Sequence, residues 1–197
     1  MDAMDEYAQF LNAKASIVQP SGFDCDVSLN ALLFPFQRDI VKWALRRGKA
    51  AIWADCGLGK SFMQLEWANH VHRHTGKPVL IFTPLAVAEQ TAEEARKFAV
   101  PEVKVVAGIG ECINGINISN YEKLHHFTPE PFGGIVLDES SILKALDGKT
   151  RKALTEFSVD IPYRLAFYWQ RIEEIVLGAS RTEPEGGGKV CSAKHVV

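Results

Sequence analysis

Short apolar runs alternate with amphipathic stretches along most of this 197-residue chain. The apolar runs predict buried strands, whereas the stretches between them repeat apolar residues at helical spacing. The predicted strands are 50–54, 79–83, 103–106, 116–119, 135–137 and 163–166, and the predicted helices are 2–14, 35–47, 60–74, 86–98, 120–125, 141–145, 149–157 and 169–177. Because strands and helices alternate, we expect an α/β fold in three layers, with a mainly parallel sheet between helices.

Composition and length fit one ordinary globular domain with flanking segments. Hydrophobic residues make up 47% of the chain and the net charge is −2, so overall charge gives no argument for a nucleic-acid partner. We place an N-terminal extension at 1–30, the globular lobe at 31–166, and an atypical tail at 167–197, whose linker-like composition from Gly178 onward favours disorder. The cysteines are far apart, the N-terminus is acidic and no apolar run approaches a membrane span. These features favour a cytoplasmic protein with no membrane partner.

The most informative stretch runs from Ala54 to Ser61 and reads Ala-Asp-Cys-Gly-Leu-Gly-Lys-Ser. It lies between a predicted strand and a predicted helix, which is the context of a phosphate-binding loop. The glycines leave the loop backbone open to a phosphate, and the helix N-terminus behind them is partly positive. Lys60 would reach the β- and γ-phosphates, and Ser61 would hold Mg²⁺. The expected cofactor-binding residues of the loop are Ala54, which replaces the usual first Gly, with Asp55, Cys56, Gly57, Leu58, Gly59, Lys60 and Ser61.

An acidic pair follows the apolar run at 134–137. Asp138, at the tip of such a strand, would hold Mg²⁺ through water, and Glu139 would orient and deprotonate the attacking water. The alternative is that both carboxylates only cap the helix that follows. The phosphate-binding loop upstream favours the catalytic interpretation, so Lys60, Asp138 and Glu139 are the candidate catalytic residues.

With these motifs placed, the chain resembles the first RecA-like lobe of superfamily 2 DNA/RNA helicases, a P-loop NTPase fold. It is most similar to their phage-type DEAD/DEAH-box and Swi/Snf-like branch, over roughly residues 9–166. The segment Phe34-Pro35-Phe36-Gln37-Arg38 matches the family's Q motif. This match implies that Gln37 reads the adenine edge and that Phe34 or Phe36 packs on the base, with core packing of both rings as the alternative. Asp138-Glu139-Ser140-Ser141 with Lys144 is similar to the extended motif II.

Two further segments resemble the family's nucleic-acid contacts. Thr83-Pro84-Leu85 matches motif Ia, which implies that Thr83 and Pro84 lie on the nucleic-acid backbone. Asn120 and Tyr121 belong to a Ser-Asn-Tyr-Glu segment that is similar to one of the same branch, although plain packing would equally explain Tyr121. The resemblance therefore implies ATP and Mg²⁺ as cofactors and nucleic acid as the partner, with DNA favoured over RNA.

The family pattern stops after Arg164-Leu165-Ala166. A Thr-x-Thr-Pro-like turn is expected next, but the chain reads Phe167-Tyr168-Trp169-Gln170, and motifs of a second RecA-like lobe do not follow. We therefore expect a lobe truncated near motif III, separated from the partner lobe whose arginine finger is worth on the order of 10³–10⁵ in rate. Such a chain would bind Mg-ATP, hydrolyse it very slowly and unwind nothing alone, which leaves its status as an enzyme open. The alternatives are a non-catalytic nucleotide- or nucleic-acid-binding module and an inert remnant.

Overall fold

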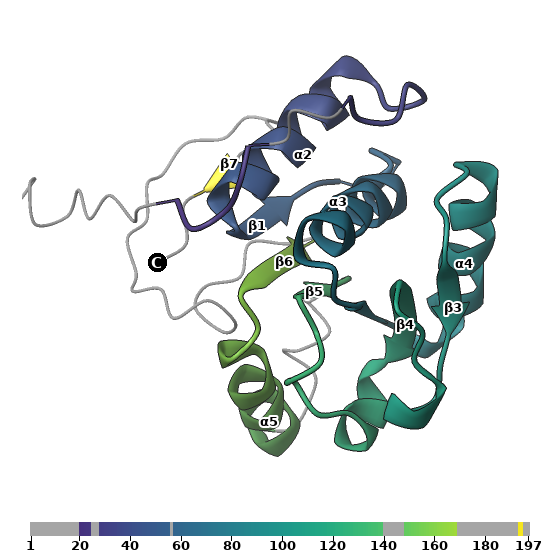
Figure 1. Cartoon of the computed structure of the whole chain (residues 1–197), viewed down its shortest axis with the longest axis vertical. Helices are drawn as coiled ribbons and strands as arrows, with labels where there is room; N and C mark the ends of the chain where they lie inside the picture. Colours follow the sequence, from purple (N-terminus) through teal and green to yellow (C-terminus); the bar gives the residue numbers. More distant parts are fainter. Residues whose placement is uncertain (1–19, 25–27, 56, 140–147, 169–192, 195–197) are drawn as a thin grey trace, which may run out of the picture.

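The computed structural model describes residues 20–24, 28–55, 57–139, 148–168 and 193–194, which build one sheet with helices on both faces (Figure 1). In this part of the chain the strands hydrogen-bond in the order β3-β4-β2-β5-β6-β1-β7. Their bounds are β1 Lys49–Trp53, β2 Val79–Thr83, β3 Val103–Val105, β4 Ile116–Asn120, β5 Gly134–Leu137, β6 Tyr163–Tyr168 and β7 Ala193–Lys194. Strands β1 to β6 are parallel, and β7 pairs antiparallel with β1.

Successive residues of the central strands face opposite sides of the sheet, and both sides are buried. Ala50 and Ile52 of β1 belong to one core cluster, while Ala51 between them belongs to the other. Ile81 and Phe82 of β2 divide between the clusters in the same way. A strand that is buried on both faces needs apolar residues at every position, which is why the sequence shows unbroken runs rather than alternation.

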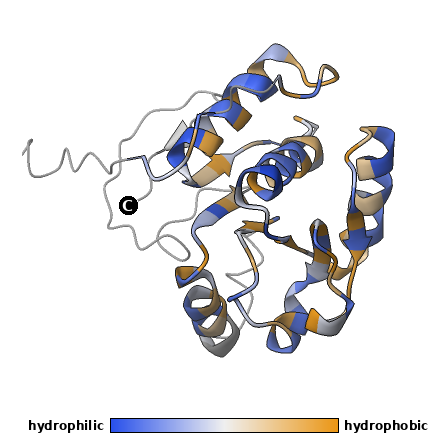
Figure 2. Cartoon of the chain, in the orientation of Figure 1, coloured by the Kyte–Doolittle hydropathy of each residue, from blue (hydrophilic) through white to orange (hydrophobic). Residues whose placement is uncertain are grey.

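Three α-helices cover one face of the sheet, and an α-helix and a 3-10 helix cover the other. The first face carries α2 Pro35–Arg47, α3 Lys60–Thr75 and α4 Ala88–Lys97, and α3 contacts both of the other two. The second face carries the 3-10 helix η3 Tyr121–His126 and helix α5 Gly148–Val159. Two further 3-10 turns, η1 Leu85–Val87 and η2 Ile109–Glu111, lie in connections. Figure 2 shows apolar positions concentrated along the strands, as three layers require.

The predicted α/β architecture is confirmed, and most elements lie where the sequence placed them. Helix 35–47 and strand 79–83 have the predicted bounds. Two predicted helices need correction, because 86–98 opens with the 3-10 turn η1 and 120–125 corresponds to the 3-10 helix η3. The cause is local, since Val87 N donates to the carbonyl three residues back and Asn120 Oδ1 accepts from the amide three residues ahead. The predicted helices 2–14, 141–145 and 169–177 lie outside the described residues.

The sheet also uses residues beyond the strand predicted at 163–166. Strand β6 continues through Phe167 and Tyr168, and the Phe167 ring is fully buried. Ala193 and Lys194, in the segment whose composition favours disorder, form the edge strand β7 beside β1. Among the helices described, none is both long enough and apolar enough to cross a membrane.

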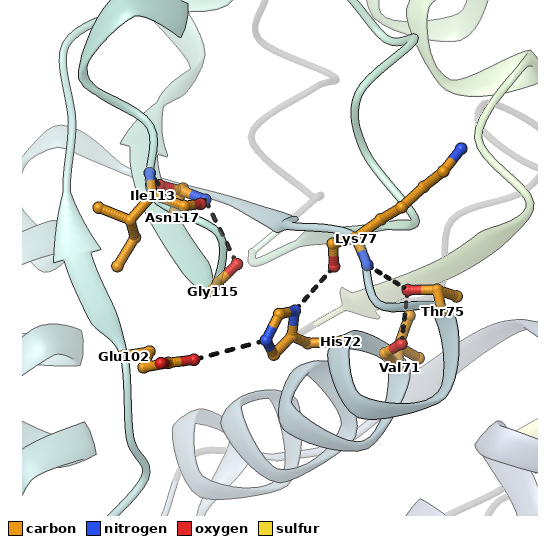
Figure 3. Close-up of polar contacts among 8 residues, drawn as sticks. All are labelled: Val71, His72, Thr75, Lys77, Glu102, Ile113, Gly115 and Asn117. Atoms are coloured by element: carbon orange, nitrogen blue, oxygen red, sulfur yellow. Dashed lines mark hydrogen bonds and ion pairs between the residues drawn. The ribbon is translucent and has the colours of Figure 1, made fainter.

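A group of polar contacts lies at the amino-terminal end of the sheet, where β2, β3 and β4 begin (Figure 3). His72 Nδ1 donates to the carbonyl oxygen of Lys77 at 2.8 Å, and His72 Nε2 lies 3.5 Å from Glu102 Oε2. Asn117 is fully buried, and its amide bonds to the backbone N–H and C=O of Ile113 at 2.9 and 3.0 Å. The His72 contacts join the end of α3 to the residues that precede β2 and β3, and the Asn117 contacts hold the turn before β4. The residues singled out for chemistry lie at the opposite, carboxyl end of the sheet.

Candidate functional site

The turn between β1 and α3 has the geometry expected of a phosphate-binding loop. β1 ends at Trp53 and α3 begins at Lys60, so strand, turn and helix follow one another directly. Gly57 and Gly59 have φ angles of 80° and 72°, in the left-handed region that glycine adopts without steric strain. A Cβ placed on Gly57 would meet no atom within 4 Å, so the loop backbone is open on that side. The loop can therefore present N–H groups to an anion in front of the partly positive N-terminus of α3.

Lys60 folds back over its own loop. Its ammonium donates to the carbonyl oxygen of Ala54 at 3.2 Å and to that of Asp55 at 3.4 Å. Ser61 follows in the first turn of α3 and is half-buried. The cationic group and the hydroxyl predicted to meet a metal-bound phosphate thus lie at the loop, while Cys56 lies outside the described residues.

The side chain of Gln37, in α2, contacts the loop directly. Its side chain is buried, its Nε2 donates to the carbonyl oxygen of Leu58 at 2.9 Å, and its Oε1 accepts from the N–H of Phe34 at 2.9 Å. A Cβ placed on Gly59 would lie only 2.4 Å from Gln37 Nε2, so this close contact requires glycine. The amide therefore caps α2 and braces the loop at once. It keeps one further N–H and one further lone pair for a ligand, as the predicted adenine contact would need.

Phe34 and Phe36 lie on the surface beside Gln37. Their exposed fractions are 64% and 43%, and their rings stack with centroids 6.1 Å apart and planes 7° from parallel. The core-packing alternative for these two rings is therefore wrong. Two exposed, nearly parallel aromatic rings form an apolar surface next to the loop.

Asp138 and Glu139 follow β5 directly. The side chain of Asp138 is 4% exposed, and the pKa of its carboxyl is raised from 3.8 to about 6, first by burial and then by repulsion from Glu139. Gln64, the Glu139 amide and Lys60 act against this rise in pKa. The ammonium of Lys60 is thus close enough to influence Asp138. Because burial disfavours the charged carboxylate, a bound cation would stabilise it.

Gln64 of α3 approaches the same carboxyl group. Its side chain is fully buried, and within the described part of the chain neither its amide nitrogen nor its amide oxygen has a hydrogen-bond partner. Its approach lowers the pKa of Asp138 without reaching full hydrogen-bond geometry. A buried polar group left without a partner costs about 1–3 kcal/mol, and water or an ion often completes such a site. A hydrated Mg²⁺, which prefers oxygen ligands and keeps several waters, fits these residues.

The order of the strands brings the loop and the acidic pair to one edge of the sheet. β1 and β5 run parallel, with only β6 between them. Carboxyl ends of parallel strands lie at the same edge, and two strand spacings separate these ends by about 10 Å. That separation suits a triphosphate held between Lys60 and Asp138.

Proteins of known structure share this fold. The SWI2/SNF2 ATPase core of Sulfolobus solfataricus in complex with dsDNA matches with a TM-score of 0.62 and 24% identity, over 73% of this chain and 33% of that one. The UvsW helicase from bacteriophage T4 matches with a TM-score of 0.59 and 14% identity, over 82% of this chain and 60% of that one. No family model matches the chain.

A curated relative from Caenorhabditis elegans decides the branch. It is the homolog of SWI/SNF-related matrix-associated actin-dependent regulator of chromatin subfamily A-like protein 1, and it is 31% identical over 149 residues. The chain contains a Swi/Snf-like superfamily 2 helicase domain. The inferred resemblance to Swi/Snf-like superfamily 2 helicases is therefore confirmed. The match spans 69% of this chain and 21% of the relative, so the helicase domain corresponds to about a fifth of that protein.

Three residues predicted to contact nucleic acid are buried in the helicase domain. The exposed fractions of Thr83, Asn120 and Tyr121 are 0%, 4% and 5%. Thr83 Oγ1 donates to the carbonyl oxygen of Pro84 at 3.2 Å, and Asn120 caps η3. The burial of the Tyr121 ring against Phe82 fits the packing alternative that the sequence left open. Pro84 is half-buried and Leu85 is 65% exposed, so within the motif Ia segment these two residues reach the surface.

Sequence reasoning missed two contributions to the acidic end of the site. Gln64 was available as a polar residue within the apolar stretch of helix 60–74, but its role depends on which strand α3 covers. Tyr121 was singled out for nucleic acid, yet its hydroxyl donates to the carbonyl oxygen of Asp138 at 2.6 Å. Local sequence gives no signal for that contact, because the two residues follow different strands.

Proposed function

We propose that the helicase domain binds Mg-ATP at the carboxyl edge of its sheet and is the ATP-binding lobe of a helicase-like ATPase acting on nucleic acid. The observation that carries this proposal is the convergence of the phosphate-type loop and the acidic pair, with Lys60 close enough to lower the pKa of Asp138. If Asp138 were only a solvated helix cap, its carboxylate would not be buried beside an unpartnered amide.

Each functional group has a distinct part in this proposal. The loop N–H groups bind the phosphates, and Lys60 exchanges its bonds to loop carbonyls for bonds to phosphate oxygens. Ser61 and Asp138 hold Mg²⁺, which when bound neutralises the charge of the phosphates. Glu139 is exposed at the tip of the strand and accepts a proton from the attacking water.

The base has a place beside the loop. Phe34 and Phe36 offer exposed, stacked rings, and Gln37 next to them retains one donor and one acceptor. A purine packed on either ring would lie near Gln37, whose Oε1 accepts from the Phe34 N–H. This arrangement supports the role for Gln37 that the resemblance implies.

Duplex DNA is the favoured nucleic-acid partner, because the SWI2/SNF2 core of S. solfataricus is a complex with dsDNA. The contact would be directed at the DNA backbone, as the resemblance of residues 83–85 to motif Ia implies. Binding should therefore be independent of sequence and should weaken steeply with salt. Fluorescence anisotropy with two unrelated labelled duplexes over a salt series measures both properties, and a salt-independent affinity would contradict the proposal.

Calorimetric titration with ATP, with and without Mg²⁺, tests the nucleotide site directly. Replacing Lys60 by Ala should weaken Mg-ATP binding about ten- to a hundredfold, because one charge-assisted contact worth about 1.5–3 kcal/mol is lost. Lys97→Ala, at an exposed position of α4, is the matched control and should bind like the wild type. Equal affinity of the wild type and Lys60→Ala would refute the proposal. Single-turnover phosphate release, with Glu139→Gln for comparison, separates an ATPase lobe from a binding module without turnover.

A further inference from the structure

The peptide bond between Asp138 and Glu139 is held at both of its polar ends. Its carbonyl oxygen accepts from the Tyr121 hydroxyl at 2.6 Å in a buried position, and its N–H donates to Asp138 Oδ1 at 3.0 Å. One residue earlier, the Asp138 N–H donates to the carbonyl oxygen of Phe82 at 2.8 Å, which continues the pairing of β5 with β2. The plane of this peptide is therefore held by the Tyr121 hydroxyl at its carbonyl end and by the Asp138 carboxylate at its N–H end, while the bond to Phe82 fixes the preceding peptide.

Glu139 needs such a support, because its backbone is strained. Its φ angle is 45°, in the left-handed region that residues with a Cβ rarely adopt. A strained φ persists only where the surrounding structure holds it, and such positions concentrate at functional sites. The φ of Glu139 describes rotation about its N–Cα bond, measured from the Asp138–Glu139 peptide plane that the Tyr121 hydroxyl holds. The Tyr121 hydroxyl thus acts on the torsion that aims the Glu139 side chain.

Tyr121 is itself rigidly placed. It is the first residue of η3, directly after β4, and its ring stacks on Phe82 with centroids 5.8 Å apart and planes 23° from parallel. Its 5% exposure leaves little room for the ring to move. A packed ring delivers its hydroxyl at a fixed position, which is what a group that orients another residue requires.

We propose that Tyr121 is a positioning residue for Glu139, the candidate acceptor of the water proton. The inference rests on the proposed function and deepens it: Tyr121 acts through the Asp138–Glu139 peptide and contacts neither nucleotide nor nucleic acid. One buried hydrogen bond, from the Tyr121 hydroxyl to the Asp138 carbonyl, thus joins the segment predicted to contact nucleic acid to the acidic pair.

Tyr121→Phe tests the inference, because it removes the hydroxyl and keeps the stacked ring. In single-turnover phosphate release with the full chain in excess over ATP, the rate should fall about tenfold or more, since small misplacement of a reacting group lowers rates strongly. The ATP concentration for half-maximal rate and the calorimetric affinity for Mg-ATP should stay within about twofold. Tyr163→Phe, at the amino-terminal end of β6, is the matched control and should change none of these.

Two further measurements distinguish positioning from a general loss of structure. In a Glu139→Ala background, Tyr121→Phe should lower the residual rate no further, because its effect passes through Glu139. Amide hydrogen exchange at residue 139, followed by NMR without nucleotide, should be faster by about fivefold in Tyr121→Phe, the size expected for one hydrogen bond. The exchange measurement needs neither ATP binding nor turnover.

The possible results separate this inference from the proposed function. If the wild type binds Mg-ATP but Tyr121→Phe has an unchanged rate, or loses rate and ATP affinity together, the positioning role is overturned. Unchanged exchange at residue 139 overturns it whether or not the chain hydrolyses ATP. Absence of Mg-ATP binding by the wild type overturns the proposed function instead.

Discussion

The contact between Gly59 and Gln37 allows a sharp test of how the phosphate-type loop is supported. Gly59 has a φ of 72°, and a Cβ there would lie 2.4 Å from Gln37 Nε2. Gly57 has a φ of 80°, but a Cβ there would meet nothing within 4 Å. Gly59→Ala and Gly57→Ala therefore introduce the same backbone strain in one loop and differ in a single contact.

The expected loss of stability follows from the backbone strain and from the contact with Gln37. An alanine forced into the left-handed region costs about 1–2 kcal/mol at either position. At residue 59 the new methyl group must also displace the Gln37 amide, which breaks its 2.9 Å bond to the Leu58 carbonyl. That bond contributes about 1 kcal/mol, so Gly59→Ala should lose about 2–3 kcal/mol of unfolding free energy. Gly57→Ala should lose about 1 kcal/mol less.

Urea unfolding followed by circular dichroism measures this difference. With an m-value of about 2 kcal/mol per molar, 1 kcal/mol corresponds to a midpoint shift of about 0.5 M between the two variants. In a Gln37→Ala background the amide is absent, so the two glycine replacements should become equivalent. The reasoning is refuted if both variants lose equal stability with Gln37 present, or if their difference survives its removal.

The remaining predictions concern the acidic end and the core. Asp138→Asn should stabilise the free protein, because a carboxyl whose pKa is raised from 3.8 to about 6 in the folded state disfavours folding once it ionises. In urea titrations, the gain in unfolding free energy should be about 3 kcal/mol above pH 6 and should vanish below pH 3.8, the ordinary pKa of the carboxyl. A gain that grew as the pH fell would contradict a raised pKa for Asp138. Gln64→Leu should add about 1 kcal/mol of stability by removing an unpartnered buried amide and should weaken Mg²⁺-dependent ATP binding; equal ATP binding would remove Gln64 from the site. Phe82→Ala, in the core, should cost about 3–5 kcal/mol on unfolding, while Phe34→Ala at an exposed position should change stability by less than about 0.5 kcal/mol.

The elements of the fold were accessible from the chain alone because each has a local cause. Runs such as 79–83 are apolar at every position because both sheet faces are covered, and Pro35 opens a helix that begins where the sequence placed it. The loop at 54–61 was recognisable because a phosphate needs bare backbone, and glycine is the residue that provides it. The 3-10 geometry at 121–126 was missed because it depends on a side-chain cap three residues away rather than on hydrophobic spacing.

Only the tertiary structure decided which side chains meet at the site. Spacing along the chain located Lys60 and Asp138, but their proximity comes from a strand order that leaves only β6 between their strands. The burial that raises the pKa of Asp138, the unpartnered amide of Gln64 and the hydroxyl of Tyr121 on the Asp138 carbonyl all arise where distant segments pack together. Local residue types determine helix, strand and loop through short-range sterics and periodicity. Desolvation and hydrogen-bond partners depend on neighbours brought in from other strands and helices, which the local sequence around a residue does not reveal.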